Sequence, residues 1–149
     1  MRVADICTRR TVHTEASASV RAAAELMRKR HVGSLIVTES PGSERGSLGI
    51  LTDRDIVLAV TASGADPDSL TVGDVMTRSP ATCAEDDDLF DAIRIMRTRG
   101  VRRLPVVDAE GNLAGIISAD DIYGTLGAQL CELGLALTRE HVRELETRT

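Results

Sequence analysis

Hydrophobic positions recur along the chain in two similar series, and each series opens with the spacing of a helix. The apolar positions that recur at helical spacing are Val20, Ala23, Ala24 and Met27 in the first series and Leu89, Ala92, Ile93 and Met96 in the second. Steps of three and four residues place these side chains on one helix face. The spacing therefore predicts helices from about Ser19 to Arg30 and from Asp88 to Arg99. Gly100 and His31 follow them, where a helix C-terminus favours a left-handed residue.

Short apolar runs follow each of these helices and predict pairs of strands. The expected pairs are Leu35–Thr38 with Leu48–Leu51, and Leu104–Val107 with Leu113–Ile117. The turn-rich segment Asp108–Asn112 predicts a hairpin in the second pair, and the polar loop Glu39–Gly46 joins the first. Each series also has a short strand before its helix and a second helix after its strands. We expect these strands near Thr11–His13 and Ala81–Cys83, and these helices over Asp53–Thr61 and from Ala119 to about Thr125.

The two series are copies of one unit. The aligned blocks are Val3–Arg9 with Val72–Arg78, Val20–Val37 with Leu89–Val106, and Gly49–Ile56 with Gly115–Ile122. Three blocks in the same order indicate duplication. One unit offers too few core residues to be stable alone, so the copies should pack sheet to sheet. The predicted fold class is α+β, with two tandem β-α-β-β-α units, pseudo-twofold symmetry and a C-terminal helix.

The repeat divides the chain into residues 1–64, a linker over residues 65–71, residues 72–124, and a helical extension over residues 125–149. Leucines with heptad-like spacing mark the extension: Leu126, Leu130, Leu133 and Leu137. Two interpretations stay open at this point. The extension docks on its own domain, or it forms a dimer or partner surface.

Composition narrows the range of functions. The net charge of −5 argues against nucleic acid, whose affinity comes largely from neutralised phosphates. No apolar run approaches the roughly 18 residues of a membrane-spanning helix, and the N-terminus lacks the apolar core of a signal peptide. We therefore expect a cytoplasmic protein. The 3 cysteines include no CxxC pair, which is typical of reduced thiols.

One polar pattern occurs twice where a predicted strand turns into a helix: Thr52-Asp-Arg-Asp55 and Ser118-Ala-Asp-Asp121. A hydroxyl beside the free N–H groups of a helix start can receive an anion. The carboxylate three residues later can accept hydrogen bonds from two vicinal hydroxyls, as a ribose presents. The same pattern is also a capping box, in which both side chains only close the helix end.

These motifs, together with Gly-Val-Arg-Arg-Leu-Pro-Val-Val-Asp over residues 100–108, resemble the cystathionine-β-synthase (CBS) domain family. A tandem of two such domains is a Bateman module, and the resemblance covers about Val3 to Gly124. It implies two clefts that bind AMP, ADP, ATP or S-adenosylmethionine as a regulatory ligand. It also implies an unknown protein partner and a homodimer, with no obligatory cofactor.

The resemblance assigns roles to individual residues. Aspartates hold the ribose, hydroxyls and arginines meet phosphate, and the first strand lies against the base. One site would then use Thr52, Asp55, Val12 and His13, and the other Ser118, Asp121, Ala81, Thr82, Arg102 and Arg103. The alternative function is a structural or interaction module that binds no nucleotide. Neither catalytic motifs nor metal-ligand spacings are present, so we expect no enzyme and no metal site.

The copies differ where a phosphate would lie. Gly33-Ser34 occupies the positions that hold Arg102-Arg103 in the second copy. A phosphate in the first site would lack a local cation unless Arg54 or the other copy supplies one. The sequence therefore predicts that the more highly charged ligand occupies the site of Ser118 and Asp121.

Overall fold

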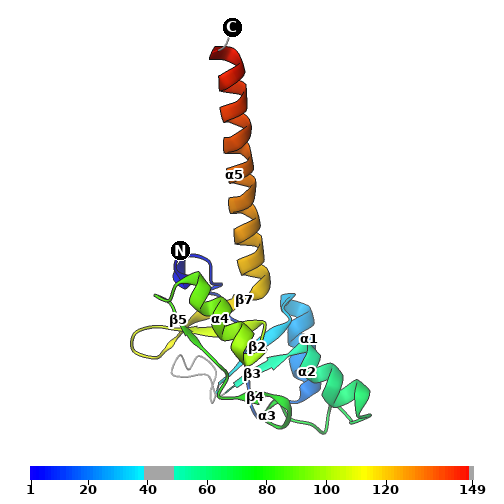
Figure 1. Ribbon diagram of the computed structural model, residues 1–149. Helices are drawn as coiled ribbons and strands as arrows, with labels where there is room; N and C mark the ends of the chain where they lie inside the picture. The colour runs from blue at the N-terminus through cyan, green and yellow to red at the C-terminus, as the bar shows by residue number, and fades with distance from the viewer. Residues whose placement is uncertain (39–48, 148–149) are drawn as a thin grey trace.

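The computed structural model describes residues 1–38 and 49–147, and it contains the predicted repeat (Figure 1). The first copy has β1 (His13–Glu15), α1 (Val20–Arg30), β2 (Ser34–Thr38), β3 (Gly49–Thr52), α2 (Asp53–Ile56) and the π-helix η2 (Val57–Ala62). The second has β5 (Cys83–Ala84), α4 (Leu89–Arg99), β6 (Arg103–Val107), β7 (Leu113–Ser118) and α5 (Ala119–Thr147). Short elements open the two copies: the 3-10 helix η1 (Val3–Asp5), and α3 (Val72–Val75) with β4 (Thr77–Arg78). The polar loop predicted over Glu39–Gly46, and Leu48, lie outside the described residues.

The two long helices of the repeat begin and end as their sequences predict. Ser19 caps α1 by accepting a hydrogen bond from the backbone N–H of Ala22, and Asp88 caps α4 through that of Phe90. At the other ends, His31 and Gly100 have left-handed φ values of 55° and 66°. A left-handed residue turns the chain out of a helix, so α1 and α4 have equal lengths and equivalent exits.

Each copy forms a small sheet with the same topology. β1 pairs parallel with β2, and β2 pairs antiparallel with β3; β5, β6 and β7 repeat this arrangement. The predicted hairpin between β6 and β7 is confirmed, because the backbone N–H of Asp108 donates to the carbonyl of Asn112 at 2.9 Å. Ile36 of β2 and Ile116 of β7 line one cleft, so the sheets of the two copies meet there.

The opening segment of each copy pairs with the sheet of the other copy. Thr77 and Arg78 of β4 pair with β3, and Thr8 pairs with Ile116 of β7 through reciprocal backbone bonds of 2.9 and 3.0 Å. Gly49 and Gly115 occupy the matching positions in the two copies. A Cβ atom there would lie 2.6 Å from the Thr77 carbonyl oxygen and 2.8 Å from that of Thr8. The close approach of the crossing segment explains why both copies have glycine.

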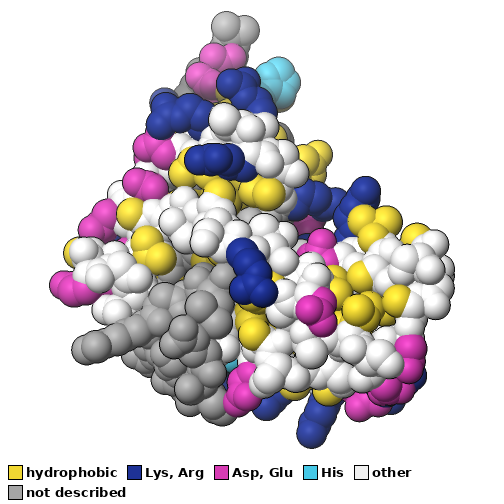
Figure 2. Space-filling model, turned by 90° about the horizontal axis from the view of Figure 1, so that it is seen from below, with side chains coloured by type: hydrophobic (Ala, Val, Ile, Leu, Met, Phe, Trp, Pro, Cys, Tyr) yellow, Lys and Arg dark blue, Asp and Glu magenta, His cyan; other side chains and the backbone are white. Residues whose placement is uncertain are grey.

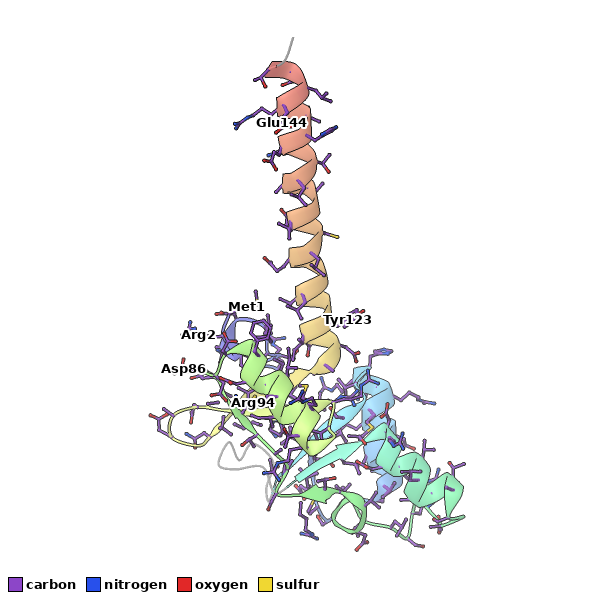
Figure 3. All side chains as sticks on the ribbon, in the orientation of Figure 1. Met1, Arg2, Asp86, Arg94, Tyr123 and Glu144 are labelled. Atoms are coloured by element: carbon purple, nitrogen blue, oxygen red, sulfur yellow. The ribbon has the colours of Figure 1, made fainter. Side chains whose placement is uncertain are left out.

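The opening segment of each copy also packs in the hydrophobic core of the other copy. Val3 is fully buried with Leu89 and Leu104 of the second copy, whereas Val72 is fully buried with Leu35 and Leu51 of the first. In Figure 3 the labelled Met1 and Arg2 lie beside Asp86, and an Arg2 guanidinium nitrogen is 3.3 Å from an Asp86 oxygen. The repeat alignment holds in space, but the first block of each copy belongs to the core of the other.

The C-terminal residues differ from the expected arrangement. The predicted short helix after β7 and the predicted extension form one helix, α5, of 29 residues. Its start packs on the second copy through the buried Ile122 and the partly buried Leu126. Beyond this point it projects away from both sheets (Figure 1), with Leu130, Leu133 and Leu137 at 69%, 58% and 60% exposed. Of the two interpretations left open, docking of the extension on its own domain therefore applies only as far as Leu126.

Candidate functional site

The two Thr/Ser-x-x-Asp motifs have one geometry. In the first, one oxygen of Asp55 accepts hydrogen bonds from the backbone N–H and the hydroxyl of Thr52, at 2.8 and 2.7 Å. In the second, Asp121 accepts the same bonds from Ser118 at 2.8 and 2.6 Å. The hydroxyl of Ser118 in turn accepts from the backbone N–H of Asp121 at 3.1 Å. Both motifs are thus capping boxes, closing the first turns of α2 and α5.

A third copy of this bonding pattern stands away from both strand ends. Asp74 accepts from the backbone N–H and hydroxyl of Thr71 at 2.9 and 2.7 Å, at the start of α3. The pKa of this carboxyl is lowered by those two hydrogen bonds from Thr71. The bonds alone therefore identify a helix cap, and what distinguishes Asp121 must be its surroundings.

Asp121 and Ser118 line a cleft between the two copies, with a volume of about 280 Å³. Its opposite wall comes from the first copy and includes Thr11, Val12, Gly33 and Ser34. The two hydrogen bonds that Ser118 donates to Asp121 both end on Oδ2, and Oδ1 forms no hydrogen bond with any described residue. A half-buried carboxylate with one available oxygen thus faces the other copy across the cleft.

This grouping differs from the one the sequence suggested. The predicted sets joined Val12 and His13 to Asp55, and Ala81 and Thr82 to Asp121. The crossing segment explains the difference: Thr8 pairs with β7, so the chain from Thr8 to Val12 runs past Ser118 at the end of that strand. The segment before the first strand of copy one consequently lies near the helix start of the second copy.

The remaining predicted residues lie in equivalent hollows or at the surface. Ala81 and Thr82 line a hollow of about 720 Å³ beside α4, and Val12 and His13 line its counterpart of about 650 Å³ beside α1. The ring nitrogen Nε2 of His13 is hydrogen bonded to the hydroxyl of Thr11 at 2.6 Å. Thr52 and Asp55 are half-buried and, within the described part of the chain, line neither hollow nor the cleft.

The two predicted arginines lie in different surroundings. Arg102 is exposed and forms an ion pair with Asp120 at 3.0 Å. Arg103 is half-buried and lines the cleft, and its Nη2 lies 3.0 Å from the position that a Cβ of Gly33 would take. The second copy therefore supplies a cation beside the Gly33-Ser34 segment, one of the two sources that the sequence left open.

Sequence reasoning missed Arg10, which lines both the cleft and the hollow beside α1. One signal could have indicated it. Arg10 directly precedes the first predicted strand, whereas the aligned position in the second copy is Ser79. A residue that differs between the copies next to a predicted binding strand indicates that the two sites bind different ligands or bind them differently.

Two kinds of feature are absent from the described residues. Residues 1–38 and 49–147 contain no group of three or more His, Cys, Asp or Glu side chains placed to hold a metal ion. The helices of the same residues include none long and apolar enough to cross a membrane.

Comparison with known proteins identifies the class. The CBS domain family model matches residues 3–62 and 72–127. The CBS domain-containing protein YhcV of Bacillus subtilis is 36% identical over 121 residues, covering 80% of this chain and 81% of that protein. The uncharacterized protein MK0525 of Methanopyrus kandleri is 35% identical over 96 residues, and the match spans 64% of this chain but only 47% of MK0525.

A solved structure carries the same fold with ligands. The CBS domain pair of protein MJ0100, in complex with 5′-methylthioadenosine and S-adenosyl-L-methionine, has a TM-score of 0.73 at 25% identity, covering 85% of this chain and 99% of that one. The doubled β-α-β-β-α fold and these matches define a tandem CBS domain pair. This chain belongs to the CBS domain family.

Proposed function

We propose that the chain is a regulatory, non-catalytic module that binds an adenosine-type nucleotide in the cleft between its two copies. One observation carries the proposal: Asp121, Ser118 and Arg103 of the second copy line a single cleft together with Thr11 and Val12 of the first. The bound methylthioadenosine and S-adenosylmethionine of the MJ0100 pair support an adenosine-type ligand.

The cleft offers a partner for each part of such a ligand. The free oxygen Oδ1 of Asp121 can accept hydrogen bonds from both ribose hydroxyls. The backbone of Thr11 and Val12, with the side chains of Val32 and Ile36, can hold a base without ring stacking. Arg103 supplies a permanent positive charge for the first phosphate, because a guanidinium does not lose its proton in proteins. The site of Thr52, Asp55, Ala81, Thr82 and Arg102 is proposed as the weaker, symmetry-related one.

The alternative is a structural or interaction module whose motifs serve only as helix caps. It is supported by Thr71 and Asp74, which form the same bonds at a helix start that lies outside the cleft. That third motif also provides the control for an experiment. Asp121→Asn and Asp74→Asn remove the same charge from the same kind of cap.

The experiment is equilibrium titration of the full chain with adenosine, AMP, ATP and S-adenosylmethionine. We expect the wild-type chain and Asp74→Asn to bind the ligand with similar affinity. Asp121→Asn should bind it with an affinity reduced by about tenfold or more, because two hydrogen bonds to a charged acceptor are weakened. If none of the four compounds binds the wild-type chain, or if both variants lose equal affinity, the structural alternative is correct.

We further propose that the protein is a homodimer in the cytoplasm, and that its state is read by an unknown protein partner. The support for a dimer is the apolar face of α5. Leu130, Leu133 and Leu137 continue the face that Ile122 and Leu126 bury, and they remain exposed in one chain. Figure 2 shows hydrophobic side chains lying among charged ones where α5 projects, at the top of the view. Twofold pairing is the commonest way for a small protein to cover such a surface.

A further inference from the structure

Unpaired positive charge is concentrated around one of the equivalent hollows. Arg10 and Arg30 line the hollow beside α1, and Arg10 and Arg103 line the cleft. None of these three guanidinium groups forms an ion pair with any residue in the described ranges. The surplus is local, because the chain as a whole has a net charge of −5. Positive groups left without partners in an acidic protein indicate an anionic ligand.

The hollow and the cleft adjoin each other. Both are lined by Arg10, Thr11, Val12 and Val32, so the Thr11-Val12 segment borders both. A ligand held by Asp121 in the cleft can therefore extend past Arg10 into the hollow. No carboxylate of the described residues lines that hollow, and Arg9, its third arginine, is already paired with Glu85 at 3.3 Å.

The equivalent hollow of the second copy has one arginine without an ion pair among the described residues, Arg99, where the first hollow has two, and it serves as an internal comparison. Ser79 stands where the first copy has Arg10, and Arg99 is the counterpart of Arg30. Arg94, the other cation of this hollow, is paired with Asp91 at 2.8 Å. The two copies thus share a fold and a hollow but differ in the charge that the hollow presents.

We propose that Arg10 and Arg30 form an anion subsite for the distal phosphates of a nucleotide held at Asp121, which makes this cleft selective for a nucleoside polyphosphate. This inference rests on the proposed function. Guanidinium groups bind phosphate oxygens in pairs and keep their charge at all physiological pH values. S-adenosylmethionine carries a positive sulfonium where the first phosphate of a nucleotide would lie, beside Arg103, and it has no distal phosphates for Arg10 and Arg30. An adenosine monophosphate would leave Arg30 without a partner.

The test is calorimetric titration of the full chain with ATP, ADP, AMP, adenosine and S-adenosylmethionine. Two variants address the subsite: Arg30→Ala, and Arg10→Ser, which installs the residue of the second copy. The matched control is Arg99→Ala, the same truncation at the equivalent helix end. We expect the wild-type chain to bind ATP at least about tenfold more tightly than AMP, since a charged hydrogen bond contributes about that factor. Each subsite variant should lower ATP affinity about tenfold and change adenosine affinity less than about twofold.

The outcomes separate this inference from the function on which it rests. Equal affinities for ATP and AMP, or equal losses of ATP affinity in Arg30→Ala and Arg99→Ala, would overturn the subsite. The proposed function would still be supported in that case if Asp121→Asn weakens adenosine binding. Failure of adenosine, AMP and ATP alike to bind the wild-type chain would overturn both. Salt gives an independent readout: raising ionic strength should weaken ATP binding more than adenosine binding, and this difference should shrink in Arg10→Ser and Arg30→Ala if these arginines contact phosphate.

Discussion

Asp121 is tied to Ser118 through one carboxylate oxygen, which receives the Ser118 backbone N–H at 2.8 Å and its hydroxyl at 2.6 Å. The cap therefore fixes the orientation of the carboxylate, which lines the cleft, while its other oxygen stays available. Structural and binding roles do not compete at this residue. The helix cap positions the acceptor that a ribose would meet, so one motif can satisfy both interpretations.

Removing the hydroxyl of Ser118 should lower the stability of the protein, because this hydroxyl caps the start of α5. Ser118→Ala deletes the acceptor for the Asp121 backbone N–H, and loss of such a cap lowers the free energy of unfolding by about 1 kcal/mol. Thr71→Ala should cost a similar amount, because its hydroxyl accepts from Asp74 in the same way. Urea denaturation of both variants measures the effect. An unchanged midpoint for Ser118→Ala beside a lowered one for Thr71→Ala would show that the Ser118 cap contributes nothing.

The exchanged opening segments predict which core a mutation weakens. Val3 is fully buried against Leu89 and Leu104 of the second copy. Val3→Ala should lower the free energy of unfolding by about 2 kcal/mol, through lost burial and the cavity that remains. Hydrogen exchange should accelerate first in α4, and in α1 for the matched variant Val72→Ala. Faster exchange in α1 for Val3→Ala would contradict the exchange of segments.

The sequence and the structure agree most closely where the signals are local. The ends of α1 and α4, the hairpin at Asp108 and the capping boxes at Thr52 and Ser118 depend on residues only a few positions apart, and each follows from its own segment. The partner of Val3 could not be predicted, because a repeat places equivalent residues in equivalent settings without saying which copy's core receives them. The grouping of Val12 with Asp121 follows from that same crossing and was missed for the same reason. Leucine spacing in α5 likewise indicates an apolar face, and it does not say what covers that face.

The cysteines should differ sharply in reactivity. Burial, with a smaller contribution from the nearby Asp87 carboxylate, raises the pKa of the Cys83 thiol to about 12. Cys131 is exposed on α5. Because the thiolate is the reactive form and must be reached by the reagent, iodoacetamide at pH 8 should label Cys131 and leave Cys83 unlabelled in the folded protein. Peptide mass spectrometry identifies the labelled residue, with the urea-unfolded chain as the positive control.

The same shift makes stability depend on alkaline pH. The unfolded Cys83 thiol loses its proton near its ordinary pKa of 9.0, whereas the folded thiol keeps it up to about 12. The unfolded state is therefore favoured increasingly as pH rises between these values, and the stability present below pH 9.0 is progressively lost. Cys83→Ala should show a smaller fall in the denaturation midpoint over this range. An identical fall in both proteins would assign the alkaline instability to other groups.

The free length of α5 gives the sharpest test of assembly. Cutting the chain after Gly127 keeps Leu126, which packs on the second copy, and removes Leu130, Leu133 and Leu137. If these leucines pair two chains, the shortened protein should be a monomer at concentrations where the full chain is a dimer, and light scattering measures both masses. Leu133→Glu should act like the truncation, since it places a charge within the apolar face. Glu132→Ala, on a neighbouring face of the same helix, should leave the dimer intact and shows that the effect is specific to that face. A full chain that stays monomeric at high micromolar concentration would refute the dimer, and a truncated chain that remains dimeric would place the interface on the sheets and short helices instead.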